Sequence, residues 1–467
     1  MSNPRVLSAD YVIVGSGAVG MAFADVILAE SAASVIIIDL HQKAGGHWND
    51  AYPFVSLHQP SEFYGVSSRE LSNGRRDQVG LNKGLSELAS GAEVSAYFDD
   101  VMRHQFLPSG RVQYFPMCRY ESEGRFTSLV SGAEFHATAN RKFVDATYLK
   151  TAVPSRHTPN FTIEDGVNFI PLNDLPLVQD TPEGYTIVGG GKTGIDACLW
   201  LLENHVDPGA IRWIMPRDAW LLDRRNTQPS EEFFEYSIGT QARQFEALSQ
   251  AQSIPELFVQ LEQCGALVRI DDSVTPQMFH GATISQLELE ELRRIKNIIR
   301  MGRVTALNND KIILEHGVVP TASNIIHVDC SASAISNIEI KPIFAGHTIT
   351  PQMVRSYQPV FSAAFIAHVE LAYGDEAHKN SLCGVVPLPN HDTDWLRMMN
   401  VFMMNQFTWS QDKGLAAWLL NNRLDGFSEL MNSVDDNDPQ RQAIIHSIRS
   451  NAGPAFENLQ TLLAQLN

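Results

Sequence analysis

The chain has 467 residues, 44% of them hydrophobic and 19% charged, which is enough for two or three domains that each bury a core. The formal net charge of -18 at pH 7, without a lysine or arginine run, disfavours nucleic acid as a partner, because a phosphate backbone would be repelled over most of the surface. The five cysteines form no Cys-x-x-Cys pair, which disfavours a disulfide framework, a zinc ribbon and a redox-active dithiol. Since the sequence has neither a leader-like N-terminus nor a bilayer-length apolar run, we expect a cytoplasmic protein with no membrane partner.

The chain begins with the pattern of a parallel βαβ unit. Residues 11–14 predict a buried strand, residues 21–30 a helix and residues 35–38 a second strand. The turn after the first strand fits the dinucleotide-binding pattern G-x-G-x-x-G, and its candidate cofactor-binding residues are Gly15, Ser16, Gly17, Ala18 and Gly20. A pyrophosphate would lie on the free N–H groups of the helix N-terminus, and Asp39 would accept hydrogen bonds from the ribose hydroxyls. The alternative is a glycine-rich turn that binds no ligand.

A second unit of the same order begins 174 residues later, at Gly189. Residues 185–188 predict a strand, residues 194–204 a helix and residues 211–215 another strand, which suits a second nucleotide-binding fold. The candidate cofactor-binding residues of its glycine loop are Gly189, Gly191, Lys192, Thr193 and Gly194. The spacing of an ATP-binding P-loop is absent, and Lys192 is a candidate to neutralise a pyrophosphate.

The remaining segments predict an α/β protein with two Rossmann-like dinucleotide-binding domains. We expect a helix over residues 94–104 and an antiparallel layer over residues 111–144, inserted in the first fold. A mostly helical insert spans residues 230–301, with an interruption near residues 271–281, and a helical tail spans residues 394–466. The predicted domains are residues 1–180 and 321–467 for a discontinuous first domain with its C-terminal helices, and residues 181–320 for the second domain with its insert.

The segment Gly45-Gly46-His47-Trp48, with the residues up to Tyr64, resembles the class B flavin-dependent monooxygenases, the group of flavin-containing and N-hydroxylating monooxygenases. In that family a Gly-Gly-x-Trp follows the ribose-binding acid. The resemblance implies that the first loop holds FAD and that Gly46, His47 and Trp48 lie along its flavin side. It also implies that His58 and Gln59 lie close to the isoalloxazine as the candidate catalytic residues. The alternatives are a core aromatic for Trp48 and a structural histidine for His58.

Two later segments bear on the cofactors. The segment 328–332 resembles a strand that returns to the first fold, with Asp329 as a flavin contact. By position, the second loop would bind the nicotinamide nucleotide of the same family. Arg217 stands where an acid would recognise the ribose of NADH, so we predict NADPH, with assistance from Arg224 and Arg225. The alternative is a solvated Arg217 paired with Asp218.

The resemblance implies a reaction in which NADPH reduces FAD, oxygen adds at the flavin C4a atom, and a nitrogen, sulfur or carbonyl centre of a small-molecule substrate is oxygenated. The linker of residues 161–171 lacks the F-x-G-x-x-x-H-x-x-x-W/Y pattern of Baeyer–Villiger members, which speaks against ester formation. The alternatives are a flavoprotein oxidase or dehydrogenase, and a non-catalytic nucleotide sensor. The sequence sets neither the substrate nor the oligomeric state, and a homo-oligomer is compatible with it.

The substrate pocket is expected between the insert and the helical tail. Four aromatic residues are candidates to line it: Phe233, Phe234, Trp395 and Trp409. The methionine-rich segment 398–404 is either helix core or, for the sensor hypothesis, an exposed apolar patch.

Overall fold

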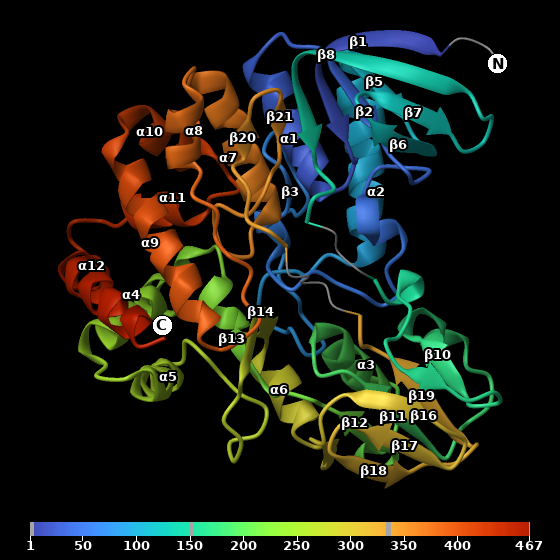
Figure 1. The fold of residues 1–467 in the computed structure, drawn as a ribbon. Coiled ribbons are helices and arrows are strands. Elements are labelled where there is room, and N and C mark those ends of the chain that lie inside the picture. Colours follow the sequence, from blue (N-terminus) through green and yellow to red (C-terminus); the bar gives the residue numbers. More distant parts are fainter. Residues whose placement is uncertain (1–3, 150–152, 333–337, 467) are drawn as a thin grey trace.

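The first glycine motif lies in a large sheet whose central strands are parallel. The computed structural model describes residues 4–149, 153–332 and 338–466. Figure 1 shows most of this sheet in blue and teal, with β20 and β21 in orange. The strand order is β20-β21-β8-β1-β2-β5. Its parallel core consists of β1 (Arg5–Val14), β2 (Val35–Ile38), β5 (Val112–Phe115) and β8 (Glu134–Asp145). The predicted strand, helix and strand of residues 11–38 are confirmed. Val12 and Ile13 point to opposite faces of β1 and are both buried, as expected for a central strand that is covered on both faces.

The antiparallel layer predicted for residues 111–144 is partly wrong. β5 pairs with β2 in parallel, so it belongs to the main sheet. The antiparallel pairs are formed by β6 (Cys118–Ser122) with β7 (Arg125–Ser128), and by β7 with the start of β8. Because β8 then runs beside β1 in parallel, the layer is continuous with the first sheet.

Helices cover the first sheet and bury its apolar face. They are α1 (Ala18–Glu30), α2 (Gly91–Val101) and α7 (Pro359–Ala372). The helices α1 and α7 pack against each other in one core with the side chains of β1 and β2. The chain returns to the first sheet through β20 (Phe344–Ala345) and β21 (Thr348–Ile349), so the first domain is discontinuous, as predicted.

The second glycine motif lies in a smaller parallel sheet, drawn below the first in Figure 1, with the order β10-β19-β11-β12-β15. Its strands are β10 (Phe169–Pro171), β11 (Gly184–Val188), β12 (Ile211–Ile214), β15 (Asn297–Ile299) and β19 (Ile325–Asp329). The helix α3 (Lys192–Glu203) follows β11. An antiparallel layer packs on this sheet and comprises β16 (Val304–Leu307), β17 (Lys311–Leu314) and β18 (Gly317–Pro320), with β9 (Thr162–Ile163) at its edge.

The second sheet corrects two expectations. The sequence places residues 328–332 in the first fold, but β19 lies between β10 and β11. A buried apolar run fits either parallel sheet, and only pairing decides between them. The predicted boundaries at residues 180 and 320 also fall inside this sheet, which extends from Phe169 to Asp329.

The insert and the tail form one helical body. The predicted interruption of the insert is β14 (Met278–Ile284), which pairs in parallel with β13 (Ala219–Asp223). The insert helices are α4 (Phe234–Gln250), α5 (Ile254–Gln263) and α6 (Gln286–Leu292). The tail helices are α9 (Asp394–Gln411), α10 (Lys413–Asn421), α11 (Phe427–Asn432) and α12 (Pro439–Ala464), and the short helix α8 (Glu376–Leu382) precedes them. In Figure 1 α12 lies beside α4 and α9, and all three share a core.

An arginine of the tail fastens the helical body to the first fold. Arg423 donates hydrogen bonds to the backbone carbonyls of Glu62 (2.7 Å), Tyr64 (2.9 Å) and Val66 (3.0 Å). Five donors in a planar fork suit such a set of carbonyls. The tail therefore fixes the segment that follows the Gly-Gly-x-Trp sequence.

Across the described ranges, every helix is too short or too polar to span a bilayer.

Candidate functional site

The first glycine loop leaves a helix N-terminus without a side-chain cap. The helix α1 begins at Ala18 with Gly17 as its N-cap residue, and no side chain of the described residues accepts from its first N–H groups. A Cβ atom on Gly20 would lie 2.0 Å from the carbonyl oxygen of Gly15, so only glycine allows this contact between helix and strand. Such a terminus presents unpaired donors and the positive end of a dipole, which bind a phosphate group.

Asp39 lies at the end of β2, beside this loop, and is buried. It accepts hydrogen bonds from the Ser16 backbone N–H and hydroxyl (2.9 Å for the hydroxyl), and from the His41 backbone N–H (2.6 Å) and ring (3.0 Å). Burial alone would raise the pKa of Asp39, but these hydrogen bonds outweigh it and lower the pKa. The carboxylate is therefore ionised, and its four acceptor positions are already used. Its contact with a ribose stays a prediction.

The Gly-Gly-x-Trp segment packs directly on the first loop. A Cβ atom on Gly46 would lie 2.7 Å from the Gly17 Cα atom, and the φ of Gly46 is 56°, so this approach requires glycine. The Trp48 indole donates to the Tyr64 hydroxyl at 2.9 Å, and the rings of His47 and Trp48 are 5.1 Å apart. Trp48 packs against the core of the first fold, which agrees with the alternative of a core aromatic, and it also lines a cavity. Its contact with a flavin stays a prediction.

That cavity has a volume of about 600 Å³ and is lined by parts of all three regions. The first fold contributes His47, Trp48, His58 and Gln59, and the second contributes Thr193 at the start of α3. The helical body contributes residues of α4, β14 and α9. The structure thus brings the candidate catalytic residues and the start of α3 to the lining of one cavity, whose size suits small molecules.

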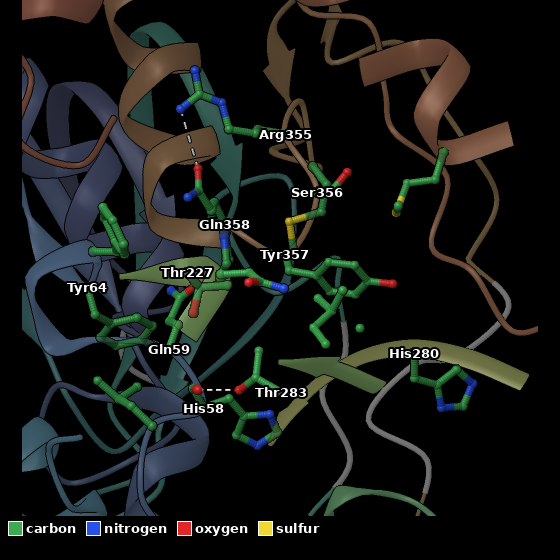
Figure 2. A pocket seen from close by; sticks show the side chains of 18 of the residues that line it. His58, Gln59, Tyr64, Thr227, His280, Thr283, Arg355, Ser356, Tyr357 and Gln358 are labelled. Atoms are coloured by element: carbon green, nitrogen blue, oxygen red, sulfur yellow. Dashed lines mark hydrogen bonds between the residues drawn. The ribbon is translucent and has the colours of Figure 1, made fainter. Parts of the chain in front are cut away.

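His58 is held by the insert and is uncharged. Its backbone carbonyl accepts from the Arg224 guanidinium at 3.2 Å and from the Thr283 hydroxyl, a contact that Figure 2 shows as a dashed line. Burial holds the pKa of His58 well below its usual value, and the charges of Lys192 and Arg224 act in the same direction. The imidazole is therefore neutral near pH 7. These contacts give His58 a structural role in addition to its place in the cavity.

The second glycine loop repeats the geometry of the first. The helix α3 begins at Lys192 with Gly191 as its N-cap residue and no side-chain cap. A Cβ atom on Gly194 would lie 2.1 Å from the Gly189 carbonyl oxygen, whereas a Cβ atom on Gly191 would meet nothing within 4 Å. Open space at Gly191 leaves room for a phosphate group against the backbone. The Lys192 ammonium is paired with Asp196, which also accepts from the Tyr52 hydroxyl at 2.5 Å, so Lys192 is already partnered.

Arg217 lies beyond the end of β12 without an acidic partner among the described residues. Its guanidinium donates to the Asn390 side chain at 2.7 Å, and Asp218 instead accepts from Arg300 at 2.8 Å, so the expected alternative pair of Arg217 with Asp218 does not form. Burial lowers the pKa of Arg217, and the nearby charge of Arg303 lowers it further. The sequence reasoning missed Arg303, which lies 86 residues after Arg217 and follows no nucleotide-binding motif.

Two arginines predicted to assist Arg217 have other partners. Arg224 is buried and pairs with Glu288 at 2.8 Å, and Arg225 pairs with Asp223 at 2.6 Å. These two assignments are wrong, because carboxylates already neutralise both side chains.

Asp329 lies at the end of β19, opposite Val188 of β11, and accepts from the Ser331 backbone N–H at 2.9 Å. It is therefore beside the second loop, and its contact with flavin stays a prediction.

Two further side chains line the cavity although no sequence pattern marks them. Arg355 pairs with Asp425 at 2.5 Å and stacks over Phe361 at 3.8 Å. Tyr357 has a φ of 57°, and its ring fills the space that a Cβ atom on Gly281 would need, at 2.1 Å. Figure 2 shows Tyr357 across the strand that carries Thr283. Its hydroxyl is buried without a partner in the described part of the chain. Backbone strain and an unpaired polar group both concentrate at functional sites.

The aromatic candidates are only partly confirmed. Trp395 lines the cavity, whereas Phe234 packs under Arg441 at 5.1 Å and Trp409 packs on Phe365 at 4.4 Å. Phe233 is also buried outside the cavity lining.

In the methionine-rich segment the core interpretation holds for residues 398, 399 and 403, which are at most 8% exposed, and Met404 is 51% exposed. The exposed patch expected for a sensor protein is therefore small.

Comparisons with known proteins agree with this architecture. No family model matches the sequence. A steroid monooxygenase, described as oxidized and bound to NADP, superposes with a TM-score of 0.50 at 15% identity, over 78% of this chain and 86% of that one. The chain therefore shares the two-domain α/β fold of flavin monooxygenases, with two Rossmann-like domains.

Closer relatives come from mycobacteria. "Uncharacterized protein Rv2000" of Mycobacterium tuberculosis and "Uncharacterized protein Mb2023" of Mycobacterium bovis are each 45% identical over 459 residues. The match covers 98% of this chain and 85% of each relative. The chain belongs to the family of these mycobacterial proteins.

The unpaired hydroxyl of Tyr357 predicts an unusual response to mutation. Tyr357→Phe keeps the ring on Gly281 and removes a buried polar atom without a partner, so we expect the melting temperature to stay the same or rise. Tyr97→Phe is the matched control, because the Tyr97 hydroxyl accepts from the Val66 N–H (2.9 Å) and donates to the Arg69 carbonyl (2.7 Å). The control should lose about 1 kcal/mol of stability. Equal losses of melting temperature in the two variants would refute the assignment of the Tyr357 hydroxyl as a buried group without a partner.

Proposed function

We propose that this protein is an FAD-dependent monooxygenase that uses NADPH and molecular oxygen to oxygenate a small-molecule substrate at a nitrogen, sulfur or carbonyl centre. One observation carries the proposal: the segment after the first glycine loop and the start of α3 line the same cavity. A flavin ring and a nicotinamide ring would therefore meet in one cavity, as hydride transfer requires. The steroid monooxygenase of similar fold, described as bound to NADP, supports this choice.

The first loop fits FAD. Its uncapped helix N-terminus and close-packed glycines suit a pyrophosphate, which Gly15, Ser16, Gly17, Ala18 and Gly20 would hold. A ribose hydroxyl could take the place of the Ser16 hydroxyl as a donor to the ionised Asp39, because the Ser16 hydroxyl can rotate away about a single bond. The flavin end of the cofactor would lie along Gly46, His47 and Trp48.

The second loop fits NADPH. Gly189, Gly191, Thr193 and Gly194, with the uncapped start of α3, would hold the pyrophosphate. Lys192 would join them by exchanging its partner Asp196 for a phosphate oxygen. The guanidinium groups of Arg217 and Arg303 would bind the 2′-phosphate, which NADH lacks.

Bound flavin supplies the electron transfer and the activation of oxygen. The chain supplies position and a dry site. Apolar walls exclude water, and the neutral imidazole of His58 and the amide of Gln59 donate or accept hydrogen bonds beside the reacting rings without adding charge. Neither residue has to act as a nucleophile. The five cysteines are all unpaired, which suits a reducing compartment, and we propose a cytoplasmic location.

Oxygen transfer distinguishes this function from an oxidase. In air, NADPH consumption by the monooxygenase should rise with an accepted substrate, and one oxygenated product should form for each NADPH consumed. An oxidase would release one hydrogen peroxide for each NADPH consumed, with or without that substrate. The measurement compares product, peroxide and NADPH in one reaction, and peroxide as the sole product for every substrate of a broad neutral and ionic panel would contradict the proposal.

Arg217 should set the cofactor preference. Arg217→Ala should raise the KM for NADPH at least about 10-fold, because a charge-assisted contact to the 2′-phosphate is lost, while the KM for NADH changes little. Arg225→Ala is the control, since Arg225 already pairs with Asp223 and should affect neither cofactor. Steady-state kinetics with both nucleotides check this. An equal loss for NADPH and NADH would show that Arg217 does not read the phosphate.

A further inference from the structure

The walls of the cavity are apolar and come mainly from the helical body. The aromatic side chains of Phe245, Phe279, Trp395 and Phe402 line it, together with Met398 and Met399. These residues belong to α4, β14 and α9, so the insert and the tail build the substrate side of the cavity. Methionine side chains adapt to bulky apolar shapes, and aromatic walls bury a large area.

The histidines of the lining are uncharged. They are His47, His58 and His280. Burial lowers the pKa of His47 to about 4, holds that of His58 well below its usual value, and lowers that of His280. Their neutral rings offer hydrogen bonds but no charge to a ligand.

The other titratable groups of the described lining are also neutral or compensated. The tyrosines are Tyr52, Tyr64 and Tyr357, whose hydroxyls stay protonated because burial raises their pKa. Arg355 and Asp425, with side chains 8% and 1% exposed, neutralise each other at 2.5 Å. No uncompensated charge therefore remains on the described lining.

Besides hydroxyl groups, the cavity lining carries glutamine amides that could recognise a polar group. Gln241 and Gln244 lie one helical turn apart on α4, Gln406 lies on α9, and Gln59 lies on the flavin side. Within the described residues, none of these four side chains hydrogen-bonds to another residue. Each amide can both donate and accept a hydrogen bond, so the set suits a carbonyl, hydroxyl or amide group on a ligand.

We propose that the cavity selects an uncharged, mainly apolar substrate with a neutral hydrogen-bonding group, which the glutamines of α4 and α9 recognise. A charged substrate would lose its hydration against these walls without gaining an opposite charge. This inference rests on the proposed function, since it takes the cavity to hold the molecule that is oxygenated. It favours neutral carbonyl and sulfur compounds over ammonium compounds and amino acids.

Direct binding to the flavin-loaded full chain tests the inference without turnover. The probes share one apolar cage and differ in charge: adamantanone, adamantylamine and adamantane carboxylate. By calorimetry near neutral pH, without NADPH, the ketone should bind at least about 10-fold more tightly than either ion. Equal or tighter binding of an ion, or no binding of the ketone, would overturn the inference.

A charge variant sharpens the experiment. Gln406→Glu introduces a carboxylate of nearly the same shape into the cavity and should tighten binding of adamantylamine at least about 10-fold. Gln411→Glu is the control, because it adds the same charge to an exposed position of the same helix and should change nothing. Equal responses of the two variants would overturn the inference.

The same samples separate this inference from the proposed function. Visible absorbance reports how much flavin the protein holds, independently of the probes. Bound flavin without charge discrimination would overturn the inference alone. Failure to bind any flavin would count against the proposed function itself.

Discussion

Two helix N-termini without side-chain caps are the constraint on which this structure depends. α1 and α3 each begin directly after a glycine and leave their first N–H groups without a side-chain partner. The glycines allow this by bringing strand, turn and helix closer than any Cβ atom would permit, as the contacts of Gly20 and Gly194 show. Each terminus thus attracts an anionic group, and the two termini belong to separate parallel sheets. Two such termini suit the two phosphate-bearing cofactors that we propose.

The insert and the tail contribute much of the lining of the cavity that we propose as the reaction site. Arg224, which directly follows β13, donates a hydrogen bond to the His58 backbone carbonyl, and Arg423 of the tail donates to carbonyls of the segment that carries Tyr64. Both arginines are thus structural, although each lies near residues proposed to work on a cofactor or substrate. The same helices supply apolar walls and amides instead of charges. Electron transfer and substrate choice are in this way assigned to different parts of one chain.

The sequence predicted what depends on local pattern. Both glycine motifs, their flanking strands and the helical tail follow from short periodic segments, and the structure contains them. It misplaced β19, because an apolar run does not reveal its partner strand, and it misassigned Arg224 and Arg225, because their carboxylate partners Glu288 and Asp223 are recognised only in the fold. Arg303, Arg355 and Tyr357 escaped notice because tertiary contacts alone give them a role.

The most direct test of the central claim is anaerobic reduction of the bound flavin by NADPH in the Gly194→Ala variant. A Cβ atom there would lie 2.1 Å from the Gly189 carbonyl oxygen, so the second loop must distort while the first stays intact. The account predicts that the variant retains flavin as the parent protein does, whereas reduction at low NADPH slows about 100-fold or more. Loss of the flavin, or an unchanged rate of reduction, would contradict the assignment of one nucleotide to each loop.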